Sequence, residues 1–232
     1  MQNLVTCRGL CKSYGNTEAL SNVDITLQSG RIIGLLGPNG SGKTTLIKLL
    51  AGLLTPTSGV ASVLGHCVGE STKAMVSYLP ERTYFDRAMK VEECIELFSD
   101  FYDDFDEQRA RSLMARLAVP TDAQFRTLSK GTCEKVQLIL VMSRRAKLYL
   151  LDEPIGGVDP AARDFILETI LSNQNYDSTI LISTHLIHDI ESVLDEAIFL
   201  QSGHVVMHDT ADNLRSKYGK SIDDVFREVF RC

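Results

Sequence analysis

One segment of the chain has the composition of a loop that binds phosphate. It matches the pattern G-x-x-x-x-G-K-[ST] and consists of Gly37, Pro38, Asn39, Gly40, Ser41, Gly42, Lys43, Thr44 and Thr45. Glycines let the backbone approach a phosphate closely, and the N–H groups of such a loop point inwards as an anion nest. The pattern also places Lys43 to reach the β- and γ-phosphates of a nucleotide and the Thr44 hydroxyl to bind Mg²⁺. We therefore predict a nucleotide site, against the alternative of an ordinary glycine-rich turn.

Two adjacent carboxylates follow a second apolar segment. Leu148–Leu151 is apolar throughout, and Asp152 and Glu153 come directly after it. Ligands of open α/β sheets bind beyond the carboxyl ends of the strands, so both acids can turn into one site with the phosphate loop. There Asp152 would bind Mg²⁺, and Glu153 would orient and polarise an attacking water. The alternative is that these acids cap a helix or lie in a solvated turn.

Strands and helices in alternation must position these residues. The segment Arg31–Leu36 leads into the glycine-rich loop, and Lys43–Leu53 after it has helical spacing. The chain continues with apolar runs of strand length at Ala74–Leu79, Leu148–Leu151, Thr179–Ser183 and Ala197–Leu200, and with helical stretches near Ala161–Leu171 and Leu186–Val193. Strands buried on both faces and separated by helices indicate a mostly parallel sheet, so we predict the α/β class.

Two segments depart from this alternation. Leu4–Cys7 and Val23–Leu27 are short β-branched runs that predict an antiparallel β subdomain at the N-terminus. From Val91 to Ala118 the pattern is that of an amphipathic helix without strands. We expect one domain over residues 1–232, with an inserted helical subdomain at roughly 85–145.

Composition supports a globular protein and argues against a nucleic-acid-binding one. The chain has 232 residues, of which 44% are hydrophobic and 23% charged, close to the globular average. It holds 24 Lys and Arg against 30 Asp and Glu, a net charge of −6. Because phosphate backbones are bound by basic surfaces, we expect no nucleic-acid partner.

The sequence also suggests where the protein works. We find neither a secretory signal nor a run of 18 apolar residues, so we expect no membrane span. No two cysteines form a CxxC pair, and we expect reduced thiols in a cytosolic protein; the cysteines are Cys7, Cys11, Cys67, Cys94, Cys133 and Cys232.

Together these residues resemble the ATP-binding cassette (ABC) ATPases, the nucleotide-binding subunits of ABC transporters, over nearly the whole chain. Leu128–Thr132 (LSKGT) stands where that family has its signature L-S-G-G-Q. Gly156–Asp159 resembles the D-loop, Ser183–His185 resembles the switch-histidine segment, and Tyr14 resembles the aromatic residue that stacks on adenine. No N-K-x-D guanine-recognition motif is present.

The resemblance implies a P-loop NTPase core and a site shared between two cassettes. In this family two copies pair head to tail, and each ATP lies between the phosphate loop of one and the signature of the other. Ser129 and Gly131 would then face the partner's γ-phosphate, and His185 would contact the γ-phosphate and act with Glu153. The implied cofactors are ATP and Mg²⁺.

The chain differs from the family pattern in two places. Lys130 and Thr132 replace a glycine and the glutamine of the signature, and Glu81 stands where the family usually has glutamine. A carboxylate can still bind Mg²⁺, so we place Glu81 with Thr44 and Asp152 as metal ligands. Its added negative charge would slow turnover or alter coupling to a partner.

Simpler interpretations stay open for several of these residues. Ser129 can be a plain helix N-cap, and Tyr14 can be a core tyrosine. His185 can be a histidine at a strand end, or can bind a metal together with His188 and Asp189.

We interpret two features of the helical stretch as structural. Four aromatic residues are spaced as the buried stripe of a helix, part of which can face out beside a membrane partner; they are Phe98, Phe101, Tyr102 and Phe105. The neighbouring acidic run predicts a solvated helix junction; it comprises Asp103, Asp104, Asp106 and Glu107.

The predicted function is that of an ATPase subunit that powers transport through separate membrane subunits. The chain length, the Pro80-Glu81 pair and the short tail after Gly219 resemble the cassettes of ABC-2-type exporters most. We expect a homodimer or heterodimer of cassettes on the cytoplasmic face of the cell membrane, held there by permease subunits. The alternatives are a soluble ABC ATPase of translation or DNA repair, and a regulatory cassette that does not hydrolyse ATP.

Overall fold

The computed structural model describes residues 2–156, 160–172 and 177–230. Its first sheet has the order β2-β1-β4-β5 and is antiparallel throughout. The strands are β1 (Asn3–Tyr14), β2 (Thr17–Gln28), β4 (Ser58–Val63) and β5 (His66–Cys67). The predicted antiparallel β subdomain is confirmed. Its strands β1 and β2 are much longer than the runs Leu4–Cys7 and Val23–Leu27 from which they were predicted.

The second sheet has the order β10-β9-β3-β8-β7-β6 and is mostly parallel. Only the edge strand β10 runs antiparallel to its neighbour. The strands are β3 (Ile32–Leu36), β6 (Val76–Leu79), β7 (Leu148–Asp152), β8 (Thr179–Thr184), β9 (Glu196–Gln201) and β10 (His204–Thr210). The predicted α/β class with a mostly parallel core sheet is confirmed.

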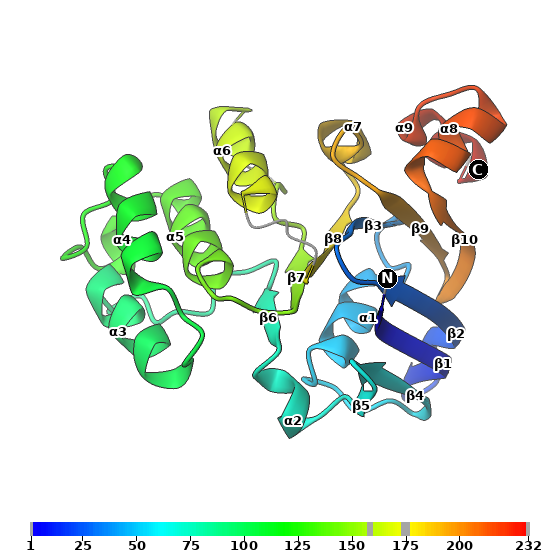
Figure 1. Ribbon diagram of the computed structural model, residues 1–232, viewed down its shortest axis with the longest axis horizontal. Helices are drawn as coiled ribbons and strands as arrows, with labels where there is room; N and C mark the ends of the chain where they lie inside the picture. Colours follow the sequence, from blue (N-terminus) through cyan, green and yellow to red (C-terminus); the bar gives the residue numbers. More distant parts are fainter. Residues whose placement is uncertain (1, 157–159, 173–176, 231–232) are drawn as a thin grey trace.

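The helices fall into a group inserted in the chain and a group that packs around the two sheets. The first group lies together at one end of the molecule (Figure 1) and comprises α3 (Val91–Phe101), α4 (Glu107–Arg116) and α5 (Lys130–Met142), with a 3-10 turn at Phe125–Thr127. The others are α1 (Lys43–Leu50), α2 (Glu70–Lys73), α6 (Pro160–Leu171), α7 (Ile187–Ile190), α8 (Ala211–Tyr218) and α9 (Ile222–Val229).

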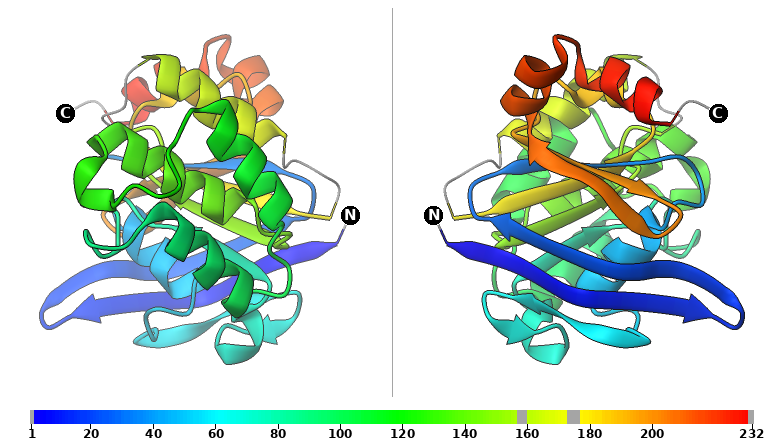
Figure 2. Two further views of the ribbon diagram at one scale, coloured as in Figure 1. Left: turned by 90° about the vertical axis from the view of Figure 1, so that its left-hand side faces the viewer. Right: turned by 90° about the vertical axis from the view of Figure 1, so that its right-hand side faces the viewer.

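The second sheet is buried on both faces, as its continuous apolar strands require. Along β3, Ile33 and Leu35 belong to a core shared with α1 and the first sheet, whereas Ile32 and Leu36 belong to a core on the opposite face. In Figure 2 the first sheet lies on one side of the molecule, and α8 and α9 lie on the other.

Helix α5 joins the inserted helices to the second sheet. Its Val136 and Ile139 are buried in a third core with α3 and α4, while Leu138 and Val141 are buried against the sheet. One helix thus contributes to two cores, which fixes the position of its N-terminus relative to the sheet.

A buried arginine reinforces the same junction. Arg144 is 4% exposed, and its guanidinium donates to Asp104 Oδ1 at 2.9 Å, to the Val76 carbonyl at 2.7 Å and to the Ala74 carbonyl at 2.8 Å. It also lies 3.8 Å from the centre of the Tyr102 ring. The guanidinium therefore links the turn between α3 and α4 to the start of β6.

The acidic run lies between two helices, as predicted, but the prediction that it is solvated was partly wrong. The helical stretch ends at Tyr102 and restarts after Asp106, whose carboxylate accepts from the Arg109 N–H at 2.9 Å. Asp104 and Asp106 are not simply solvated, because they pair with arginines of the α5–β7 turn. In the aromatic stripe Phe98 is buried, whereas Phe101, the last residue of α3, is 75% exposed, so part of the stripe faces out as expected.

The five cysteines within the described ranges are free thiols. Two of them, Cys7 and Cys94, are buried, and burial raises the pKa of each to about 12. Cys232 lies outside the described residues. Over the described part of the chain, no helix combines the length and the apolar character that crossing a membrane requires.

Candidate nucleotide site

The phosphate loop follows β3 and ends where α1 begins at Lys43. Two of its glycines are required by close backbone approach. A Cβ on Gly37 would lie 2.3 Å from the Leu200 carbonyl oxygen, and one on Gly42 would lie 2.5 Å from the Ala19 carbonyl oxygen. Gly42 also has a φ of +107°, which side chains rarely adopt. The loop conformation thus depends on these glycines, and it leaves the N-terminal end of α1 open to an anion.

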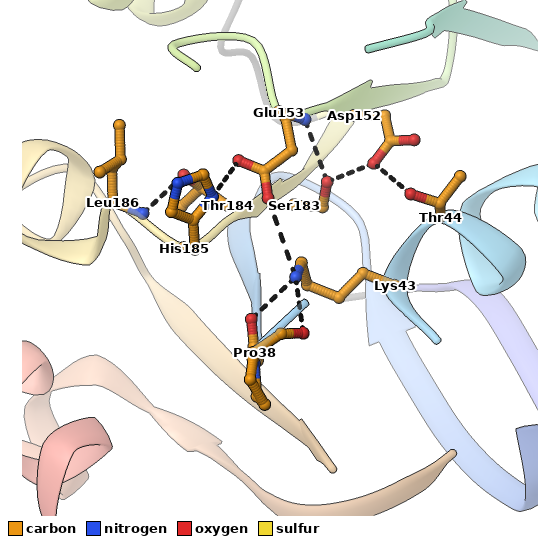
Figure 3. Close-up of polar contacts among 10 residues, drawn as sticks. Pro38, Lys43, Thr44, Asp152, Glu153, Ser183, Thr184, His185 and Leu186 are labelled. Carbon is orange, nitrogen blue, oxygen red and sulfur yellow. Dashed lines mark hydrogen bonds and ion pairs between the residues drawn. The ribbon is translucent and has the colours of Figure 1, made fainter. Parts of the chain in front are cut away.

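Lys43 is the buried cation of the site. It is 6% exposed, and its ammonium donates to the carbonyls of Gly37 at 2.7 Å and Pro38 at 3.2 Å (Figure 3). The Glu153 Oε1 atom lies 3.8 Å away. Burial lowers the pKa of Lys43, and the charges of Glu153 and Asp152 oppose that shift. The loop therefore holds a positive charge above its own backbone.

Asp152 is the centre of a hydrogen-bond network at the end of β7. It is 1% exposed, and its Oδ1 accepts from Ser183 Oγ at 2.6 Å and from Thr44 Oγ1 at 3.2 Å. Burial raises the pKa of Asp152, and the two hydrogen bonds counteract the rise. Its Oδ2 is buried without a hydrogen-bond partner. A buried carboxylate oxygen beside a threonine hydroxyl is a donor set that suits Mg²⁺.

Glu153 faces the same site because the backbone turns at this residue. Its φ is +51°, an unusual value for a residue with a side chain, and its carbonyl accepts from the Gly156 N–H at 3.1 Å. In a continuing strand adjacent side chains would point to opposite faces. The left-handed conformation instead brings Glu153 Oε2 within 3.0 Å of His185 Nδ1 (Figure 3). Such strained residues are concentrated at functional sites.

Ser183 is a site residue to which the sequence analysis gave no role. It is fully buried, its hydroxyl donates to Asp152, and its oxygen accepts from the Glu153 N–H at 3.1 Å. One side chain therefore positions both carboxylates. The available signal in the sequence was a serine at the end of an apolar run; its register opposite Asp152 is seen only in the structure.

An open chamber of about 880 Å³ lies in front of these groups. Its lining includes all loop residues from Asn39 to Thr45, together with Glu153, His185 and Glu81. Glu81 thus shares a chamber with Thr44, as predicted for a metal ligand, and it also lines an adjoining cavity of about 20 Å³ with Asp152. Whether Glu81 binds Mg²⁺ stays a prediction.

Gln137 of α5 also borders the small cavity and was missed in the sequence. It is 2% exposed, and its side-chain amide donates to the Pro80 carbonyl at 3.2 Å. Because Pro80 precedes Glu81, this bond ties α5 to the segment that carries Glu81. In the sequence, the signal for Gln137 was a polar residue within an otherwise apolar stretch of helix.

The signature segment lies at the N-terminus of α5, beside the chamber of its own chain. Ser129 caps the helix and accepts from the Thr132 N–H at 3.1 Å, so the simple interpretation as an N-cap is correct as far as one chain goes. Of this segment, Lys130 lines the chamber and Ser129 and Gly131 do not. Lys130 is 81% exposed, and its ammonium lies 3.6 Å from Glu134 Oε1.

Tyr14 and the alternatives for His185 can now be placed. Tyr14 ends β1 and is 48% exposed, so it is not a core tyrosine; it lies outside the chamber lining, and its stacking on adenine stays a prediction. A metal site at His185 with Asp189 is disfavoured, because Asp189 pairs with Arg163 at 2.6 Å. Within the described ranges no cluster of His, Cys, Asp and Glu could hold a metal by itself.

Of the D-loop Gly156–Asp159, the residues after Gly156 lie outside the described residues.

Comparisons with known proteins agree with this geometry. The profile of the family described as ABC transporter matches residues 20–156. The chain is 30% identical to the ABC transporter ATP-binding protein YtrB of Bacillus subtilis, over 94% of this chain and 75% of that protein. It is 34% identical to the uncharacterized ABC transporter ATP-binding protein sll0415 of Synechocystis, over 82% of this chain. The match spans only 56% of the length of that relative.

A solved structure shares the whole architecture. The structure described as an ATP binding subunit of an ABC transporter superposes with a TM-score of 0.89. It covers 98% of this chain and 100% of that one, at 28% sequence identity. The likeness therefore includes both sheets and the inserted helices.

Proposed function

Since the chain belongs to the ABC transporter family of ATP-binding proteins, we propose that it binds and hydrolyses ATP to power transport through separate membrane subunits. The observation that carries this proposal is that Lys43, Glu153 and His185 line one chamber at the phosphate loop, with Asp152 lining the small cavity that adjoins it. Neither the soluble translation or repair ATPase nor the regulatory cassette has an observation in its favour.

Nucleotide binding uses groups that are already in place. The loop N–H groups and the N-terminal end of α1 hold the phosphates. The Lys43 ammonium turns from the loop carbonyls and Glu153 to the β- and γ-phosphates, which offer stronger acceptors. Tyr14 stacks on the adenine. This exchange frees Glu153 from the lysine once the nucleotide is bound.

Hydrolysis uses the freed carboxylate. Glu153 accepts a proton from a water whose oxygen attacks the γ-phosphorus, while the bond from that phosphorus to the oxygen of ADP breaks. His185 holds Glu153 through its Nδ1 and presents the rest of its ring to the γ-phosphate. Ser183 fixes the backbone under Glu153, so the carboxylate is oriented before the water arrives.

The oxygen donors beside the loop would hold the magnesium ion that accompanies ATP. We assign Thr44, Asp152 and Glu81 to it, since Asp152 has a buried oxygen without a partner and Thr44 lies beside it. When bound, the ion supplies positive charge that offsets the charge on the phosphates.

The site is completed by a second cassette. Ser129 and Gly131 lie at the start of α5 and do not line the chamber of their own chain. We propose that two copies, or this chain and a related cassette, pair head to tail so that each signature covers the other's ATP. ATP binding then closes the pair, and hydrolysis opens it.

A separate groove of about 520 Å³ suits the membrane partner. It is largely apolar and lies between the sheet and the turn after α3, with Leu53, Tyr78, Tyr84 and Tyr102 among its lining. Leu53 and Tyr84 are more than half exposed, which is costly unless a partner covers them. We propose that a permease subunit docks here on the cytoplasmic face of the membrane, and that the Pro80-Glu81 pair marks an exporter of the ABC-2 type.

The proposal is tested by ATP turnover of the chain with its membrane subunits. We expect Mg²⁺-dependent phosphate release that disappears in Glu153→Gln, and co-purification with a membrane protein that is lost in Tyr84→Asp. Turnover unaffected by Glu153→Gln would contradict the assignment of the base. Recovery with ribosomes or DNA in place of a membrane protein would contradict the transport role.

A further inference from the structure

Thr132 stands at a signature position where the resemblance leads one to expect glutamine, and its contacts suggest what it does there. Its backbone N–H donates to Ser129 Oγ at 3.1 Å, and its own hydroxyl oxygen lies 2.8 Å from the same atom. Ser129 is exposed, whereas Thr132 is half-buried on the first turn of α5. Both contacts therefore converge on the one oxygen that is offered to a partner.

The number of hydrogen-bonding positions on a hydroxyl fixes the consequence. A serine hydroxyl can accept two hydrogen bonds and donate one. The contact between the two hydroxyls allows either oxygen to be the donor. If the O–H of Thr132 donates to Ser129 Oγ, as its N–H does, the two lone pairs of that oxygen are used. The hydrogen of Ser129 then has no partner in its own helix turn, and it is left to point away from α5 towards an acceptor.

We propose that Thr132 is a positioning residue that makes the Ser129 hydroxyl a dedicated donor to the γ-phosphate held by a second cassette. The proposal rests on the shared site of the proposed function. Phosphate oxygens only accept hydrogen bonds, so a serine with its lone pairs facing outwards would repel them. The sequence of donors from Thr132 to Ser129 to phosphate also lets each bond polarise the next.

The neighbouring lysine does not compete for this role. Lys130 points along the helix to Glu134, with 3.6 Å between its ammonium and Glu134 Oε1, a spacing of four residues. Thr132 is three residues after the cap, and residues at this spacing are neighbours on a helix surface, so its side chain lies beside Ser129. The side chain that contacts the serine is therefore that of Thr132.

The test compares Thr132→Val with Thr132→Ser in a Glu153→Gln background that traps the ATP-bound pair. Valine keeps the shape and the N–H of threonine but has no hydroxyl, and serine restores the hydroxyl. Association of the full chain with ATP and Mg²⁺ is measured by sedimentation. We expect Thr132→Val to weaken pairing about three- to tenfold, as loss of one hydrogen bond implies, and Thr132→Ser to stay within about twofold of the parent.

A double-mutant cycle separates positioning from a merely structural role. If Thr132 acts through Ser129, then Thr132→Val adds nothing to the loss caused by Ser129→Ala. ATP affinity of the unpaired chain should be unchanged in both variants, because neither change touches the phosphate loop. Thermal unfolding is measured alongside, since Ser129→Ala also removes the N-cap of α5. Equal pairing of Thr132→Val and the parent, or fully additive losses, would overturn the inference.

The Glu153→Gln parent shows whether a negative result concerns the role of Thr132 or the site shared between two cassettes. If Glu153→Gln alone shows no ATP-driven pairing, even with the membrane subunits, the shared site fails and the role of Thr132 fails with it. If the parent pairs and the cycle is additive, the shared site stands and only the role of Thr132 is wrong.

Discussion

The two halves of the proposed nucleotide site are built in opposite ways. The phosphate-loop half, comprising residues 37–45 with Asp152, Glu153, Ser183 and His185, lies at the edge of the parallel sheet. Lys43, Asp152 and Ser183 are 6%, 1% and 0% exposed. The signature half, residues 128–132, lies on the inserted helices, where Ser129 is exposed and Lys130 is 81% exposed. The first half has a buried, internally bonded centre, with His185 and the loop tip at 38–40 exposed around it, and the second half is presented to solvent.

This difference indicates that one chain suffices for nucleotide binding, whereas hydrolysis requires the two halves together. The first half has its cation, its carboxylates and its donors in place within one chain, so it can bind nucleotide alone. The second half has donors with no ligand in its own chain. Its position is set by α5, which packs in two cores, and by Arg144 at the far end of that helix. One copy should therefore bind ATP, and two should be needed to hydrolyse it.

The largest expected effect comes from the base in the buried half. Glu153→Gln keeps the side-chain shape and a hydrogen bond to His185, but an amide cannot accept a proton from water. Phosphate release should fall about 10²- to 10⁴-fold, while ATP binding, followed with a fluorescent nucleotide, should persist. Full turnover of this variant would show that another group acts as the base.

Lys43→Ala should have the next largest effect, and it separates the two halves directly. Hydrogen bonds to charged groups contribute about 1.5–3 kcal/mol, so the ATP affinity of one chain should fall about ten- to a hundredfold. Ser129→Ala is the matched change in the exposed half and should leave that affinity unchanged. Equal losses from both variants would show that one chain uses both halves.

Ser183→Ala should lower turnover about five- to tenfold, because it removes the hydroxyl's hydrogen bond to the Asp152 carboxylate and one of the two acceptors of the Glu153 N–H, the Ser183 carbonyl being the other. Burial already raises the pKa of Asp152, and the Ser183 hydroxyl counteracts that rise. Losing the hydroxyl raises the pKa further, so Asp152 becomes protonated at higher pH as the solution is acidified. The acid limb of the pH–rate profile should move to higher pH, whereas exposed Ser99→Ala should leave it in place.

The smallest effect should come from Glu81→Gln at the boundary between the halves. Both side chains offer an oxygen to Mg²⁺, so turnover should change less than about threefold. The concentration of Mg²⁺ needed for half-maximal turnover should rise, since an amide oxygen carries less charge than a carboxylate. An unchanged rate with unchanged Mg²⁺ dependence would remove Glu81 from the site.

The sequence predicted best what depends on neighbours along the chain. The phosphate loop, the strand before it and the helix after it are formed by one continuous stretch of sequence, residues 32–50, and the structure places them as expected. The apolar strands were equally clear because both faces of the sheet are buried. Family resemblance, and not residue spacing, supplied the functional interpretation of Ser129 and His185.

What could not be predicted depends on contacts between distant segments. The role of Ser183 follows from its register opposite Asp152, and the direction of Glu153 follows from a positive φ that its residue type does not signal. Asp104 seemed solvated because its partner Arg144 is 40 residues away. Helical spacing predicted the aromatic stripe, but it could not show that Phe101, at the end of α3, is the member that faces out.

The division of labour between the halves is tested most directly by mixing two inactive copies. Lys43→Ala lacks a working phosphate loop but keeps its signature, and Ser129→Ala has the reverse defect. A mixed pair contains one complete site, so the mixture should release phosphate faster than the two variants do separately, with the unmutated chain as the positive control. A mixture no more active than the sum of its parts would contradict a site shared between two copies.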